Sequence, residues 1–205
     1  MVDDDPSVLR ALCRLFLAAG LEPRAFTSPA AFLEAHDPAT SGCLLLDLAL
    51  PGLDGLEVQQ ALSAANCARP IVFITGRGDI PTTVQAMKGG AVDFLTKPVN
   101  DRDLLAAVRN AIEIDRAARE AQVEMDAMKQ RLANLTPRER EVLVHVVAGR
   151  LNKQIAADLG TVEKTIKVHR ARIMEKMAVR SLADLVRAAE RLGLPGAGGT
   201  ANTIS

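Results

Sequence analysis

Short apolar runs alternate with longer segments of helical spacing over the first hundred residues. The apolar runs are short enough to be buried strands, and they lie at residues 44–46, 71–74 and 91–95. The segments with helical spacing lie at residues 7–19, 57–65 and 82–88. Strands that alternate with helices indicate a parallel sheet with helices on both faces. This part of the chain is therefore predicted to be α/β, with a doubly wound parallel sheet.

A polar side chain stands at the end of each predicted strand. Asp47 ends the first run, Thr75 follows the second and Lys97 follows the last, while an apolar residue near the start leads into Asp3 and Asp4. In open α/β sheets the chemistry lies beyond the carboxyl ends of the strands. Clustered acids can bind Mg²⁺ through oxygen, and a cation, a hydroxyl and an ammonium could together neutralise a phosphoryl group on Asp47. In its own segment Asp47 could equally be a turn or helix-capping residue, and it is the other strand ends that favour a site.

These features resemble the receiver domain of bacterial two-component response regulators over residues 1 to about 115. The segment 90–98, GAVDFLTKP, carries the resemblance most specifically. The resemblance implies a flavodoxin-like sheet of five strands in the order 2-1-3-4-5. It also implies that Asp47 accepts a phosphoryl group from a sensor histidine kinase, and that Asp3, Asp4 and Asp47 bind Mg²⁺ together with the carbonyl oxygen of Ala49.

Four further positions gain a role from the same resemblance. Thr75 and Lys97 would contact the phosphoryl group, Phe94 would change rotamer with Thr75, and the small Gly76 would leave access to the site open. Arg77 adds a charge nearby, whereas Ala49 can neither orient an attacking water nor shield the phosphoryl group. Whether Ala49 and Arg77 lengthen or shorten the lifetime of the phosphoryl group stays open.

The first strand is expected to be unusually short. Only Met1 and Val2 precede Asp3, although a strand of about five residues is usual. In the implied topology this strand is central, so each unpaired ladder group would cost about 1–3 kcal/mol. Either the native start lies upstream or the strand is shortened, and a chain with about four to six more native residues is expected to melt at a higher temperature.

The middle of the chain is predicted to be one long helix. No Pro or Gly occurs between residues 101 and 135, and Asn100 can cap the helix with Asp103 as its box partner. Its length would be about 50 Å. Apolar residues recur on a heptad from Leu104 to Leu135, which is the coiled-coil period. The helix could pair with a second copy or pack on its own domains, and its many alanines bury little area.

The last part of the chain is predicted to be an all-α, four-helix domain. A helix start is indicated by Thr136-Pro137-Arg138-Glu139, in which Thr caps and Glu completes a capping box. Further helices are expected at residues 152–159, at about 163–177 and from 181 onward. Short helices joined by a Gly turn are typical of a helix-turn-helix.

The third of these helices has a basic face. Its apolar residues Ile166, Ile173 and Met177 lie on one stripe, so its basic side chains point outward. A major groove admits one helix, and basic side chains give affinity for phosphates. Without its neighbours, such a helix would more often be a solubilising basic surface.

The order of the helices resembles the LuxR-type helix-turn-helix domain over residues 135–192, through LTPRE, NKQIA and EKTIKVH. A receiver joined to this domain is a NarL/FixJ-type response regulator. The resemblance places Lys167, Val168 and Ala171 at base contacts. Its candidates for phosphate contacts are Asn152, Lys153, Lys164, Arg170, Arg172 and Lys176, while His169 fits a packing or phosphate role. Val162 replaces a common capping serine, and Thr161 is an alternative cap.

The net charge of zero is unevenly spread along the chain. Residues 1–112 carry 9 basic and 13 acidic side chains, a balance of −4, whereas residues 135–205 carry 12 and 7, a balance of +5. This asymmetry indicates an anionic partner for the last part. We expect a receiver at 1–112, a helical linker at 113–134, a DNA-binding domain at 135–192 and a flexible tail at 193–205.

The combined resemblance implies a phosphorylation-regulated transcription regulator rather than an enzyme. Its partners would be a sensor histidine kinase, double-stranded DNA, RNA polymerase and, on phosphorylation, a second copy of the chain. The sequence shows no membrane span and no signal peptide, and its 3 cysteines lie in apolar contexts, as free thiols in the cytoplasm would. One alternative is an aspartyl-phosphate hydrolase, which generally needs a second acid where this chain has Ala49. Another is a DNA-binding protein whose receiver is only a dimerisation scaffold.

Overall fold

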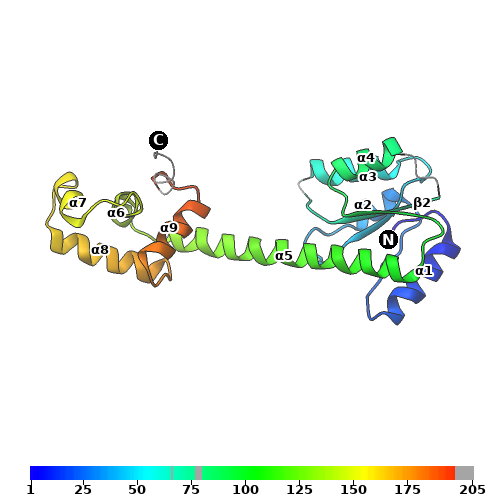
Figure 1. Cartoon of the computed structure of the whole chain (residues 1–205), viewed down its shortest axis with the longest axis horizontal. Helices are drawn as coiled ribbons and strands as arrows, with labels where there is room; N and C mark the ends of the chain where they lie inside the picture. Colours follow the sequence, from blue (N-terminus) through cyan, green and yellow to red (C-terminus); the bar gives the residue numbers. More distant parts are fainter. Residues whose placement is uncertain (66, 77–79, 197–205) are drawn as a thin grey trace, which may run out of the picture. The chain divides into compact units, whose positions relative to one another are not determined.

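The computed structural model describes residues 1–65, 67–76 and 80–196, and Figure 1 traces its elements. The chain forms two compact units, of which the first is Met1–Arg119 and the second begins at Glu120. Residues 197–205 of the predicted tail lie outside the described residues. No helix in the described ranges is both long and apolar enough to cross a bilayer.

The first unit contains a parallel sheet in the order β1-β2-β3. Its strands are β1 (Leu44–Asp47), β2 (Ile71–Thr75) and β3 (Asp93–Thr96). Asp47 pairs with Ile74, and Thr75 pairs with Thr96, so the carboxyl ends of the three strands lie at one edge. Every residue of β1 and β2 is buried, as expected for strands covered on both faces.

The implied strand order is kept, but in the described part of the chain only three of the five strands form in full, and the first is reduced as the short start of the chain led us to expect. Val2 forms isolated parallel bridges to Phe26 on one side and Leu46 on the other. The order across the sheet is therefore Phe26, Val2, β1, β2, β3, in which each of the first two strands is reduced to one bridging residue. The ladder at Val2 is closed by hydrogen bonds from its N–H to Leu45 O (2.9 Å) and from Asp47 N–H to Val2 O (2.9 Å).

Helices cover both faces of the sheet, which confirms the doubly wound architecture (Figure 1). The helices of this unit are α1 (Pro6–Ala18), α2 (Pro29–Ala35), α3 (Gly55–Ala64), α4 (Ile80–Lys88) and the first part of α5 (Asp101–Ala133). One core joins α2, α3 and α4 to one face of the sheet, and a second core joins α1 and α5 to the other. Three predicted helices therefore form with slightly shifted ends, which is the usual uncertainty of helix boundaries.

Sequence reasoning missed the short helix α2. Its start carries a recognisable signal, because the Oγ of Ser28 accepts a hydrogen bond from Ala31 N–H (3.2 Å) and Pro29 occupies the first turn. The long helix begins as predicted, since the N–H of Asp103 donates to Asn100 Oδ1 at 2.8 Å.

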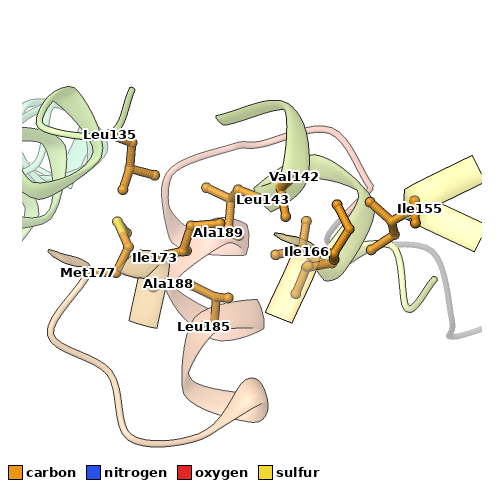
Figure 2. Close-up of a cluster of buried hydrophobic side chains, with 13 residues drawn as sticks. Leu135, Val142, Leu143, Ile155, Ile166, Ile173, Met177, Leu185, Ala188 and Ala189 are labelled. Atoms are coloured by element: carbon orange, nitrogen blue, oxygen red, sulfur yellow. The ribbon is translucent and has the colours of Figure 1, made fainter. Parts of the chain in front are cut away.

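The second unit is all-α, as predicted. Its helices are α6 (Pro137–Val147), α7 (Asn152–Asp158), α8 (Glu163–Lys176) and α9 (Leu182–Arg191). They enclose one apolar core, and Figure 2 shows side chains of α6, α8 and α9 within it. Met128 and Leu132 of the predicted heptad pack against this core. These two heptad positions of α5 are thus used within the chain itself.

Two helix starts in the second unit contrast with each other. The capping box predicted at Thr136 is formed, with Glu139 N–H donating to Thr136 Oγ1 (3.3 Å) and Thr136 N–H donating to Glu139 Oε2 (2.8 Å). The alternative cap at Thr161 is not formed, because α8 begins directly after Val162, whose apolar side chain accepts no capping hydrogen bond. The first turn of α8 therefore keeps N–H groups that no side chain at the cap satisfies.

Candidate functional site

The predicted strand-end residues converge at the carboxyl edge of the sheet. Asp47 is the last residue of β1 and Thr75 the last residue of β2, and both are almost completely buried. Asp3 follows the bridging Val2 and is also buried. Lys97 follows β3, and its N–H donates to Thr75 O at 2.7 Å. Residues from four separate segments thus meet at one edge of the sheet, where the side chains of Asp3, Asp47 and Lys97 are in contact.

Lys97 joins two of the acids. Its ammonium nitrogen lies 2.7 Å from Asp3 Oδ2 and 2.7 Å from Asp47 Oδ2. Burial alone would lower the pKa of Lys97, but the hydrogen bonds and negative charges of Asp3 and Asp47 outweigh burial and raise the pKa above its usual value. The ammonium therefore stays charged over the physiological range and compensates one of the two carboxylates.

A second group of acids overlaps the first. Asp3, Asp4 and Asp47 each offer a carboxylate oxygen, and these oxygens lie within 4.8 Å of one another. Backbone groups orient two of the side chains, because Asp5 N–H donates to Asp3 Oδ1 (2.9 Å) and Ala49 N–H donates to Asp47 Oδ1 (3.2 Å). Clustered carboxylate oxygens are the donor set that a hard divalent cation prefers.

Open space lies beside Gly76, which follows Thr75 at the end of β2. A Cβ built at Gly76 would meet no atom of the described residues within 4 Å. Ala49 is exposed, and Phe94 is half-buried with its ring centroid 6.3 Å from that of Phe73. Arg77 lies outside the described residues.

The basic face predicted on α8 is exposed in the second unit. Ile166 and Ile173 of α8 are fully buried, so the opposite side of this helix faces solvent. The predicted contact residues that are exposed are Lys153, Lys164, Lys167, Val168, Ala171 and Arg172. Lys167 also forms an ion pair with Glu163 one turn earlier (3.4 Å).

The remaining candidates, Asn152, His169, Arg170 and Lys176, are half-buried, and three of them form hydrogen bonds within the domain. Arg170 Nη1 donates to Asn152 Oδ1 (2.9 Å), and Lys176 Nζ donates to Glu139 Oε2 (2.7 Å). The Nδ1 atom of His169 is buried, and the described part of the chain offers it no hydrogen-bond partner. Sequence reasoning missed the pairing of Lys176 with Glu139, because the two residues belong to different helices and only the fold brings them together.

Comparison with known protein families identifies both units. The receiver domain of response regulators matches residues 1–109. The family described as bacterial regulatory proteins, luxR family, matches residues 133–189. The two matches agree with the α/β and all-α units of the structure.

Several similar proteins span nearly the whole chain. Nodulation protein W of Bradyrhizobium diazoefficiens is 50% identical, with 95% of this chain and 86% of that protein covered. Transcriptional regulatory protein FixJ of the same organism is 40% identical, with 95% of each chain covered. The solved structure of response regulator StyR is 46% identical with a TM-score of 0.84, covering 93% of this chain and 96% of that one. The chain therefore belongs to the NarL/FixJ-type response regulators, in which a phosphorylated receiver domain controls a LuxR-type DNA-binding domain that regulates transcription.

Proposed function

We propose that Asp47 is the residue that accepts the phosphoryl group, and that a sensor histidine kinase donates it. The position of Lys97 carries this proposal, because its ammonium lies 2.7 Å from Asp47 Oδ2 and already supplies positive charge where phosphoryl oxygens would form. The carboxylate of Asp47 attacks the phosphorus, and the bond from phosphorus to the kinase histidine breaks as the new oxygen–phosphorus bond forms.

The acid cluster fits Mg²⁺. Asp3, Asp4 and Asp47, with the carbonyl oxygen of Ala49, would hold the ion, since three carboxylate oxygens already lie within 4.8 Å of one another. Bound there, Mg²⁺ would supply positive charge that neutralises the phosphoryl oxygens and the crowded carboxylates.

The response to phosphorylation would pass through three residues beside Asp47. The new oxygens draw in the Thr75 hydroxyl and the Lys97 ammonium, and Phe94 turns into the space that Thr75 leaves. Gly76 keeps access to the site open for the phosphodonor. Phosphorylation shifts the population of the active form only by as much as it stabilises that form over the inactive one.

The output would be DNA binding by α8 as a homodimer. Lys167, Val168 and Ala171 would face base edges in the major groove, and the exposed basic side chains around them would contact phosphates. A dimer would place two recognition helices about 34 Å apart, one turn of DNA. Bound dimers would act on RNA polymerase in the cytoplasm.

Labelling with a small-molecule phosphodonor tests the proposal. Wild-type protein in Mg²⁺ is expected to gain one phosphoryl group, whereas Asp47→Asn gains none. Asp54→Asn is the matched control, because Asp54 caps α3 through a hydrogen bond that an asparagine can also accept. Retained labelling of Asp47→Asn would contradict the assignment.

DNA footprinting tests the second half of the proposal. Protection of DNA is expected to strengthen when the phosphodonor or beryllofluoride is present, and only in chains that keep Asp47. Equal protection with and without either reagent would favour a receiver that serves only as a scaffold.

A further inference from the structure

A buried acid far from the phosphorylation site in sequence holds the long helix to the receiver. Asp115 of α5 is only 4% exposed and has no part in the acid cluster. Its carboxylate accepts hydrogen bonds from Ser41 Oγ (3.0 Å), Gly42 N–H (2.9 Å) and Arg119 Nε (2.8 Å). All three hydrogen bonds reach the same oxygen, Oδ2, and a buried carboxylate persists when it is hydrogen-bonded and paired in this way.

Two arginines bind the same loop, residues 37–42, which connects α2 to β1. Arg119 of α5 donates to the carbonyl oxygens of Pro38 (2.8 Å), Ala39 (3.0 Å) and Thr40 (2.9 Å). Arg69 donates from the segment before β2 to the carbonyl oxygens of Asp37 (2.9 Å), Thr40 (2.7 Å) and Gly42 (3.4 Å). We call Asp115, Arg119, Arg69 and this loop the loop clamp.

The loop clamp depends on the charge of Asp115. Both guanidinium groups donate to the carbonyl oxygen of Thr40, and the carboxylate of Asp115 is paired with Arg119 at 2.8 Å, where it offsets the positive charge of that guanidinium. Burial alone would raise the pKa of Asp115, but hydrogen bonds from Arg119, Gly42 and Ser41 hold the pKa below its usual value. Asp115 is therefore ionised at neutral pH and serves as the counter-ion.

The position of the loop clamp connects two functional segments. Gly42 comes just before β1, the strand whose last residue is Asp47. Asp115 and Arg119 lie beyond residue 109, where the match to the receiver family ends, and Arg119 is the last residue of the first compact unit. Helix α5 continues from there to Ala133. The loop clamp thus fastens the base of the phosphorylated strand to the helix that leaves the receiver.

We infer that Asp115 and Arg119 are positioning residues for phosphorylation-controlled DNA binding, because they keep the middle of α5 attached to the loop before the strand that carries Asp47. The inference rests on the phosphorylation of Asp47 proposed above. If this part of α5 detached, its position would no longer depend on the state of the receiver, and the coupling free energy between phosphorylation and DNA binding would fall.

The ratio of DNA affinities with and without phosphodonor tests this inference. The probe is a duplex selected from a random pool by the phosphorylated wild-type chain. Full-length Asp115→Asn and Arg119→Gln are expected to label at Asp47 as the wild type does, yet to lose roughly threefold or more of the phosphorylation-dependent gain in affinity. A purely structural loss would lower labelling and both affinities together, leaving their ratio unchanged.

Matched controls lie on the same helix. Glu113 and Arg116 form an exposed pair one turn apart, with side chains 59% and 62% exposed. Glu113→Gln and Arg116→Gln remove a charge from α5 without touching the loop clamp, so they are expected to keep the wild-type ratio. An unchanged ratio in the clamp variants, or an equal loss in the controls, would overturn the inference.

Hydrogen exchange separates failure of the inference from failure of the proposed function. Amides of residues 37–42 and 112–119 are expected to exchange faster in Asp115→Asn and Arg119→Gln than in the wild type and the controls. If phosphodonor does not raise the affinity of the wild type for DNA, the proposed function fails. The exchange rates then still test whether the loop clamp holds α5 to the loop at residues 37–42. Exchange rates that stay at the wild-type value in both clamp variants would overturn the loop clamp itself. If Asp115→Asn does not fold, the exchange rates and affinity ratio of Arg119→Gln decide the question.

Discussion

At the scale of single residues, the pocket at the carboxyl edge of the sheet, which we propose is phosphorylated, is held together by one ammonium between two buried acids. The convergence of Asp3, Asp47, Thr75 and Lys97 could be predicted, because the carboxyl ends of parallel strands meet at one edge of a sheet. The sequence could not show that Lys97 would bridge Asp3 and Asp47 simultaneously, since that depends on the path of the chain after β3. This bridge makes the stability of the pocket sensitive to cations.

Removing the ammonium should destabilise the receiver. Lys97→Met leaves two buried carboxylates without their partner, and because the Lys97 side chain is 29% exposed, the loss in free energy of unfolding is expected to be about 1–3 kcal/mol. Denaturant unfolding in a chelator measures this loss. Added Mg²⁺ should shrink it, because the ion supplies the missing charge, whereas the exposed control Lys88→Met should change little. A loss that Mg²⁺ does not reduce would contradict the shared pocket.

The cysteines offer a second test of local environment. Burial raises the pKa of the Cys43 thiol to about 11, whereas Cys67 Sγ lies 3.2 Å from His36 Nε2. Burial lowers the pKa of His36 below its usual value, so the ring beside Cys67 is neutral at neutral pH. Because the thiolate is the reactive form, iodoacetamide at pH 7.5 should alkylate Cys67 before Cys43, as mass spectrometry of timed samples would show. Cys43 reacting first would refute this order.

At the scale of elements, the long capped helices and the three buried strands were predictable, whereas the two strands reduced to single bridging residues were not. Thr136 and Asn100 marked helix starts because their signals are local. Val2 and Phe26 bridge only because the fold brings them together, and although the sequence before Asp3 limits the pairing of Val2, nothing in the segment around Phe26 limits it to a single residue. The same is true of Glu139, which the capping box predicted as a helix-start residue and the fold also pairs with Lys176.

This pairing makes the DNA-binding unit sensitive to acid. The hydrogen bonds from Lys176 and from the N–H of Thr136 lower the pKa of Glu139 from 4.5 to about 2. A group with a depressed pKa stabilises the fold above its unfolded pKa and loses that contribution as the pH falls through its folded pKa. The stabilisation is therefore complete above about pH 4.5 and lost toward pH 2, and it amounts to about 3 kcal/mol.

Unfolding of the second unit at several pH values measures this contribution. Glu139→Gln should reduce stability at pH 6 and flatten the decline between pH 5 and pH 2. Glu141→Gln is a matched control on the same helix, because the Glu141 side chain is 52% exposed and pairs with Arg138 at the surface. If Glu139→Gln and the wild type decline in parallel, another acid is responsible.

At the scale of the whole molecule, the order of the two domains could be predicted from the sequence. The expected receiver ends at residue 112, and the compact unit that contains it extends to Arg119. The difference arises from contacts of Asp115 and Arg119 with the loop at residues 37–42, which lie too far away in sequence for periodicity to reveal. In the same way, the heptad pattern of α5 did not indicate which surface its apolar residues would contact. In the structure Met128 and Leu132 of this heptad pack against the core of the second unit.

The salt dependence of DNA binding reports how many chains bind to the DNA. The logarithm of the DNA-binding constant falls with the logarithm of salt concentration by about 0.9 for each phosphate contact. If Lys164 contacts a phosphate, Lys164→Gln should reduce this slope by about 0.9 when one chain binds and by about 1.8 when two chains bind. Binding measured with phosphodonor between 50 and 200 mM salt, roughly the range in which such contacts dominate, distinguishes the two. The exposed lysine of the linker helix provides the control Lys129→Gln, and an equal slope change in that variant would show that the effect reflects net charge rather than a contact made by α8.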